Sequence, residues 1–187
     1  MTGIRDTALV YGEAVQRNPF LVNAACGAMF AGLGDLAGQT MEKRGDNDFT
    51  FSATRVRNIA LIRVFLAVPW ILFWYPRLEN LAPGSDNLSL AYRVLIDFLV
   101  GTPVMIFIVF AGNAVLTGQS LPEAVALFKQ RFLPTYKKGA QFWPFVHFFV
   151  TYRLELIYRP LFAAVASMYW NAVLSWSATR NLENKKK

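Results

Sequence analysis

The 187-residue chain has few of the residues from which catalytic and metal sites are built, with only one cysteine and one histidine. A single cysteine excludes an internal disulfide framework and a cysteine-based metal site. The sequence also lacks a Ser/His/Asp set, a paired-carboxylate pattern and a phosphate-binding glycine loop. From these absences we expect a protein that is not an enzyme and that holds no metal or cofactor.

The two rare residues each have an apolar setting. Cys26 lies in an apolar run, which favours a small buried residue over a reactive thiol. His147 lies among Trp143, Pro144 and several phenylalanines, with no cysteine or second histidine in the sequence nearby. We therefore interpret His147 as a packed or interfacial residue rather than a ligand or a general base.

Charge is scarce as well, at 17% of residues, whereas soluble domains contain about 25%. Hydrophobic residues reach 55%, among them 16 Phe, 7 Tyr and 5 Trp, a composition typical of lipid-facing helices with aromatic belts. The net charge is +7. Because the basic residues lie between apolar runs and in the terminal lysines, they favour contact with anionic lipid headgroups over nucleic acid.

Four apolar stretches predict the fold. They cover residues 20–41, 59–75, 94–116 and 142–176, the last with a charged break at 153–159. The third stretch would be about 35 Å long as a helix, and the hydrocarbon core of a bilayer is about 30 Å thick. We therefore predict an all-α integral membrane protein, with residues 1–187 as a single membrane domain and about four transmembrane helices.

Two further helices are predicted to be amphipathic, over residues 3–17 and 121–132. Ser120 and Glu123 form a capping-box pattern at the start of the second. Its apolar residues share one face; they are Leu121, Val125, Phe128 and Phe132. We expect this helix to lie in the membrane interface before the last span.

Ionisable groups inside an apolar run are costly and need a partner or water. One interpretation is that Asp35, Gln39, Arg63 and Asp97 line a polar path. In the alternative, Asp35 caps a helix or forms an ion pair near the interface. Arg63 would then either extend to a lipid phosphate or pair with Asp35 or Asp97. Small residues four apart, including the pair Gly34 and Gly38, would let another helix approach closely.

The charged break has two interpretations. Glu155 and Arg159 are four residues apart and can pair on one helix face, giving a self-neutralised interruption. Alternatively, the basic residues form a site for anionic lipid, such as cardiolipin, or for partner subunits. The candidates for that site are Arg63, Arg153, Arg159, Lys185, Lys186 and Lys187.

In their order and spacing, these landmarks resemble the Mpv-seventeen family, also named for the 22-kilodalton peroxisomal membrane protein. The residues that carry the resemblance, between Tyr11 and Arg180, include Gly34, Asp35, Pro69, Trp74, Tyr75, Trp143, Pro144, Arg159, Trp170 and Asn171. The resemblance implies a four-span protein of the mitochondrial inner membrane or, alternatively, the peroxisomal membrane. It also implies a weakly selective, solute-permeable channel.

The chain departs from the family pattern at several positions. Where the family usually has glycines before the proline of its second span, this chain has Arg63, Phe65 and Val68. Two functions therefore remain open. One is a channel for small solutes. The other is a non-catalytic accessory subunit of a larger mitochondrial inner-membrane complex, which docks other membrane subunits or copies of itself and binds anionic lipid.

Overall fold

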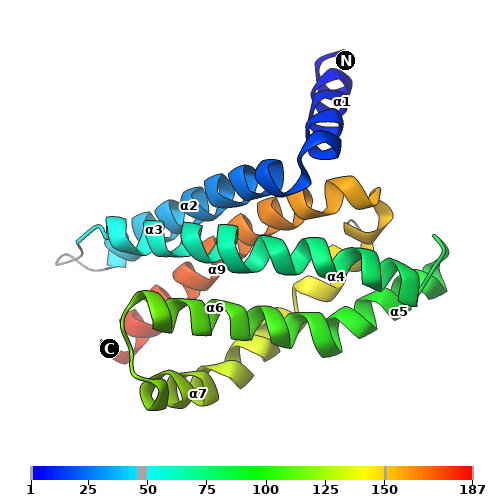
Figure 1. The fold of residues 1–187 in the computed structure, drawn as a ribbon. Helices are drawn as coiled ribbons and strands as arrows, with labels where there is room; N and C mark the ends of the chain where they lie inside the picture. The colour runs from blue at the N-terminus through cyan, green and yellow to red at the C-terminus, as the bar shows by residue number, and fades with distance from the viewer. Residues whose placement is uncertain (1, 46–49, 150, 187) are drawn as a thin grey trace.

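The computed structural model describes residues 2–45, 50–149 and 151–186, with side chains for 9–43, 50–149 and 152–172 (Figure 1). These residues form helices joined by short connections, with no β-strand among them, which confirms the all-α class. The α-helices are α1 (Thr2–Arg17), α2 (Pro19–Gly45), α3 (Ala53–Ile62), α4 (Val68–Leu81), α5 (Asn87–Ile96), α6 (Thr102–Leu116), α7 (Leu121–Ala140), α8 (Trp143–Phe149) and α9 (Arg159–Lys186).

Three helical segments are long and apolar enough to cross a membrane. Helix α2 supplies the first, over Pro19–Lys43. The second and third are two continuous rods, Ala53–Leu81 and Asn87–Leu116, each built from two α-helices joined by a π-helical turn. The predicted spans 59–75 and 94–116 lie inside these rods but begin too late in the chain. Among the described residues α9 is not one of the three, so the fourth span remains a prediction.

The π-helical turns, η1 (Arg63–Ala67) and η2 (Asp97–Gly101), form at equivalent places in the two rods. Each precedes a proline, Pro69 or Pro103, which has no N–H and whose ring crowds the carbonyl four residues back. The wider turn relieves this crowding: the Val68 N–H bonds the Arg63 carbonyl, and the Thr102 N–H bonds the Asp97 carbonyl. The first residue of each π turn is charged: Arg63 in η1 and Asp97 in η2.

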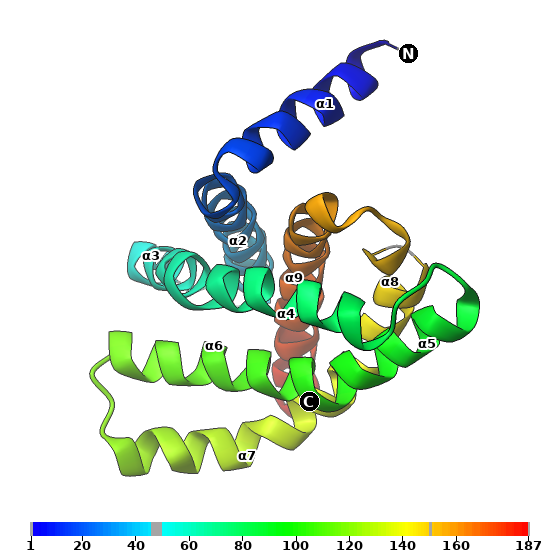
Figure 2. The same cartoon turned by 45° about the vertical axis from the view of Figure 1, so that its right-hand side comes forward.

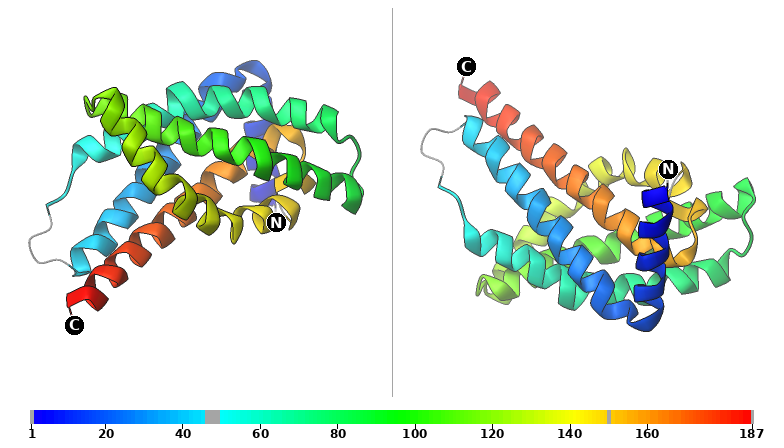
Figure 3. Two further views of the ribbon diagram at one scale, coloured as in Figure 1. Left: turned by 90° about the horizontal axis from the view of Figure 1, so that it is seen from below. Right: turned by 90° about the horizontal axis from the view of Figure 1, so that it is seen from above.

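Helices α2 and α9 run side by side across the rods (Figure 3). They approach closely at Gly34, where a Cβ atom would lie 3.0 Å from the Met168 Cα atom. A side chain at this position would require the backbone of α9 to shift by a few tenths of an ångström. The close approach expected from the small residues of α2 is confirmed here.

Helix α1 projects from the bundle (Figure 2). It is tied to α2 by a 3.0 Å hydrogen bond that the Tyr11 hydroxyl donates to Asn23 Oδ1, and its Tyr11 ring stacks on Tyr158. Burial raises the pKa of Tyr11 to about 12, so the hydroxyl remains a donor at neutral pH. Val15 is buried, so one face of α1 packs on protein.

Helix α7 begins at the predicted capping box, where Glu123 Oε2 accepts a 2.9 Å hydrogen bond from the Ser120 N–H. It continues beyond the predicted end at residue 132 to Ala140. Its aromatic face packs on the Asn87–Leu116 rod: Phe128 contacts Phe107 and Phe110 edge-on. Leu121 and Val125 are exposed, and their placement in a membrane interface stays a prediction.

Candidate functional site

The helices line a partly open cavity of about 250 Å³, which we call the central cavity. Aromatic rings from both rods, α8 and α9 form much of its wall; they include Trp70, Trp74, Tyr75, Trp143 and Trp170. Its most polar residues are Arg63, Asp97, His147, Ser167 and Asn171. Four residues were predicted to line a polar path. Arg63 and Asp97 line this cavity, whereas Asp35 and Gln39 do not.

Asp97 is held on both carboxylate oxygens. The Trp74 Nε1–H donates a 2.6 Å hydrogen bond to Oδ1, and His147 Nε2 lies 3.3 Å from Oδ2. Gly101 makes room for this arrangement, because a Cβ atom there would lie 2.0 Å from Asp97 Oδ1. Asp97 therefore has its partners within the protein, although sequence analysis did not identify Trp74 or His147 as those partners.

His147 is packed, as expected from its apolar setting. It is 7% exposed, and its ring stacks on Trp143 and on Tyr152, with ring centroids 5.4 and 5.0 Å away. Its Nδ1 atom is buried and makes no hydrogen bond within the described residues. These residues contain no group of three His, Cys, Asp or Glu side chains arranged to hold a metal ion.

Arg63 enters the cavity from η1 and donates a 2.8 Å hydrogen bond to the Ser167 hydroxyl of α9. Its aliphatic stem lies against Gly27, where a Cβ atom would be 3.1 Å from Arg63 Cγ. The predicted ion pair with Asp35 or Asp97 is wrong, because both carboxylates have other partners. The alternative, in which Arg63 extends to the membrane surface, is also wrong, because its guanidinium points to Ser167 inside the bundle.

Asp35 and Gln39 instead join α2 to the start of α3. Asp35 Oδ1 lies 2.7 Å from Arg55 Nε, and Gln39 Nε2 donates to Asp35 Oδ2 at 2.8 Å. Gln39 Oε1 accepts a 2.8 Å hydrogen bond from the Ser52 N–H. This network corresponds to the expectation that Asp35 forms an ion pair, and the polar-path interpretation fails for both residues.

A second ionic cluster lies where the rods meet α9. Glu79 accepts from Arg93, at 2.8 Å, and from Arg159, and both arginines are at least 95% buried. The predicted Glu155–Arg159 pair is therefore wrong: the chain breaks into 3-10 turns between α8 and α9, so the two residues do not share an α-helical face. Sequence analysis singled out neither Glu79 nor Arg93.

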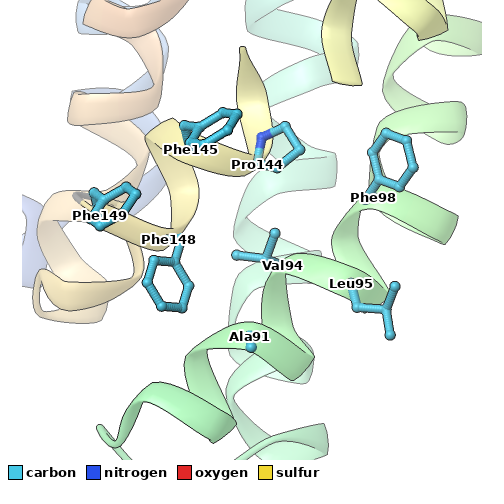
Figure 4. Close-up of a pocket in the computed structure, with 8 residues that line it drawn as sticks. All are labelled: Ala91, Val94, Leu95, Phe98, Pro144, Phe145, Phe148 and Phe149. Atoms are coloured by element: carbon cyan, nitrogen blue, oxygen red, sulfur yellow. The ribbon is translucent and has the colours of Figure 1, made fainter. Parts of the chain in front are cut away.

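An apolar groove of about 370 Å³ lies between α5 and α8 (Figure 4). Its lining residues are Ala91, Val94, Leu95, Phe98, Pro144, Phe145, Phe148 and Phe149. Arg153 borders it: its guanidinium lies 5.5 Å from the centre of the Phe148 ring and donates to Asn87 Oδ1 at 2.8 Å. Arg153 thus keeps its predicted candidacy for lipid contact, whereas Arg159 is occupied by Glu79. Lys185, Lys186 and Lys187 lie outside the residues whose side chains are described.

Several residues that carried the family resemblance meet at the central cavity; they are Trp74, Tyr75, Trp143, Trp170 and Asn171. The model of the Mpv17 / PMP22 family matches residues 114–175, which supply the α7, α8 and α9 walls of the cavity. Over these residues the chain is similar to the Mpv17/PMP22 family. The recognition made from sequence is thereby confirmed.

Relatives extend this likeness along most of the chain. PXMP2/4 family protein 4 of Dictyostelium discoideum is 24% identical over 94% of this chain and 95% of its own length. Protein sym-1 of Neurospora crassa is 28% identical over 89% and 95%. The mitochondrial inner membrane protein Mpv17 of rat is 25% identical over 90% and 95%, and its name agrees with the location expected from the sequence. No solved structure matches the chain.

Proposed function

We propose that the chain is a channel-like protein of the mitochondrial inner membrane that lets small polar solutes cross. The observation that carries this proposal is the central cavity. It places Arg63, Asp97, His147, Ser167 and Asn171 in the interior of an apolar helical bundle, where polar groups are costly and mark solute paths. The location is carried over from the name of the rat relative.

In this proposal α9 is the fourth membrane span. It runs beside α2, itself long and apolar enough to span, and buries Ala163, Ala164 and Ala166. Because α9 also contributes Ser167 and Asn171 to the cavity, its insertion would complete the polar wall. A cavity of about 250 Å³ lies below the usual range of about 300–1,000 Å³ for sites of drug-sized ligands, which favours a small solute.

The first prediction is a block of conductance from inside the cavity. Replacing Cys26 by alanine removes the single cysteine, and Ile106→Cys then places one thiol on the cavity wall. We expect purified protein in planar bilayers to conduct potassium chloride. An anionic methanethiosulfonate reagent should then reduce the conductance of Ile106→Cys several-fold.

Leu99→Cys in the same background is the matched control, since Leu99 is on the same rod, is 59% exposed and does not line the cavity. The reagent should leave its conductance unchanged. Bilayers that stay silent at high protein loading, or an equal block in both variants, would overturn the proposed path.

The groove between α5 and α8 favours a second function, and we also propose a lipid-dependent accessory role in a larger inner-membrane complex. Arg153 and Asn87 lie at the groove, and Asn87 is the first residue of the candidate span Asn87–Leu116. A phospholipid could place its phosphate on Arg153 and one acyl chain along the apolar wall from Ala91 to Phe98, about 10 Å of helix.

The second prediction concerns this lipid. In native mass spectrometry of the detergent-solubilised protein, Arg153→Gln should reduce retained cardiolipin several-fold. Arg77→Gln is the matched control, because Arg77 is also an arginine over a phenylalanine ring, 3.5 Å from the centre of Phe73, but does not border the groove. An equal loss in both variants would contradict the site. Migration in native gels of organelle membranes only as a monomer or homo-oligomer would contradict the accessory role.

A further inference from the structure

The cavity contains a positive charge without a negative partner. Arg63 makes one side-chain hydrogen bond within the described residues, to the neutral Ser167 hydroxyl. The Ser167 hydroxyl donates its own hydrogen to the Ala163 carbonyl at 2.7 Å. Its oxygen therefore accepts the hydrogen bond from Arg63 and gives the guanidinium no negative charge. A guanidinium has five N–H donors, and four of them are therefore left for another group. An unpaired charge in an apolar bundle is costly, so a counter-ion there would be bound favourably.

The carboxylate that shares the cavity lining with Arg63 already has other partners. Asp97 lines the same cavity, but Trp74 and His147 take its two carboxylate oxygens. Asp35 is paired with Arg55 outside the cavity. Among the residues with described side chains, no carboxylate forms an ion pair with Arg63.

Asn171 supplies a second donor to the cavity that Arg63 lines. It follows Ser167 by four residues on α9, so the two side chains share one helix face, and both line the cavity. The Asn171 amide makes no hydrogen bond within the residues whose side chains are described. A guanidinium and a free amide in the same small space are the groups that bind an oxyanion.

We propose that the central cavity binds a small oxyanion, a carboxylate or a phosphate, with Arg63 as its charged ligand and Asn171 as its second donor. The proposal deepens the proposed function by naming the class of solute, and it rests on that function only for transport. Binding itself requires only the cavity. An anion seated there supplies the missing counter-charge, and a volume of about 250 Å³ limits it to a small molecule.

Tryptophan fluorescence provides the test, because four of the five tryptophans line the cavity: Trp70, Trp74, Trp143 and Trp170. The third prediction is that inorganic phosphate or malonate, added to the full chain in detergent at constant ionic strength, changes this fluorescence saturably. The two probes distinguish a phosphoryl from a carboxylate ligand. Dihexanoyl phosphatidate tests for a lipid source and should bind no more tightly than phosphate.

Arg63→Gln should weaken binding at least about ten-fold, the effect of losing one hydrogen bond to a charged group. Arg63→Lys should retain part of the affinity. Asn171→Asp keeps Arg63 and adds a repelling charge, so it should also weaken binding. Arg57→Gln is the matched control, because Arg57 lies on the same rod but bonds Asn58 and is outside the cavity.

A fluorescence response that is absent in the wild type, or unchanged in both Arg63→Gln and Asn171→Asp, overturns the anion site. Circular dichroism establishes whether each variant is folded. If Arg63→Gln does not fold, Asn171→Asp provides the test of the site. Conductance without anion binding would contradict the anion site but not the proposed channel function. Saturable anion binding by a protein that does not conduct would support the anion site and contradict the channel function.

Discussion

Replacing Glu79 by glutamine is expected to destabilise the fold by about 2–3 kcal/mol, less than the cost of about 3–5 kcal/mol for breaking a fully buried ion pair, because the Glu79 side chain is 34% exposed. Glu79 pairs with two arginines: Arg93, which is 1% exposed, and Arg159, which is 4% exposed. Glutamine keeps one acceptor oxygen but turns an amide NH₂ group toward a guanidinium. Both cations would then be held chiefly by backbone carbonyls, such as those of Ala82 and Leu154.

The measurement is the temperature at which the detergent-solubilised protein loses its monodisperse peak in size-exclusion chromatography. Glu42→Gln is the matched control, since Glu42 also pairs with an arginine, Arg55, whose side chain is 46% exposed. An exposed pair contributes about 0–1 kcal/mol, so this variant should remain close to wild type. Equal losses in the two variants would mean that Glu79 does not hold the rods against α9.

The buried charged residues show which features could be predicted from the sequence and which could not. The hydropathy pattern identified Arg63 and Asp97 as residues of interest, because a charged residue inside an apolar run is energetically costly and therefore needs a specific partner. It overlooked Arg93 because the predicted span began at residue 94, whereas the rod begins at Asn87 and contains Arg93. A boundary error of a few residues thus moved a buried arginine into an apparent loop.

Partners were harder to predict than positions. The pairing of Glu155 with Arg159 assumed an unbroken helix, but the chain turns there, and Arg159 reaches Glu79, 80 residues away in sequence. Arg63 and Asp97 stand at matching π turns, yet each faces different neighbours because helix rotation decides which side chains meet. Local spacing sets which residues share a helix face. It does not set which face of another helix they contact.

Gly101→Ala is expected to disrupt the Asp97 arrangement and to destabilise the protein by about 2–5 kcal/mol, from overpacking together with loss of a hydrogen bond to a charged group. The new Cβ atom would lie 2.0 Å from Asp97 Oδ1 and 2.6 Å from Trp74 Nε1. One of these two groups must therefore move, and their 2.6 Å hydrogen bond is lost. Near-ultraviolet circular dichroism should show the displaced Trp74 ring, and thermal unfolding in detergent measures the destabilisation.

Gly139→Ala separates this effect from the general effect of adding a methyl group. Gly139 is also buried and lines the same cavity, but a Cβ atom there would lie 3.5 Å from Trp143 Cδ1, an ordinary contact. That variant should unfold close to the wild-type temperature. In a Trp74→Phe background, where the donor is already gone, Gly101→Ala should cost less than it does alone, because the two changes remove the same bond. Strict additivity would show that Gly101 acts on the fold by some route other than the Trp74–Asp97 pair.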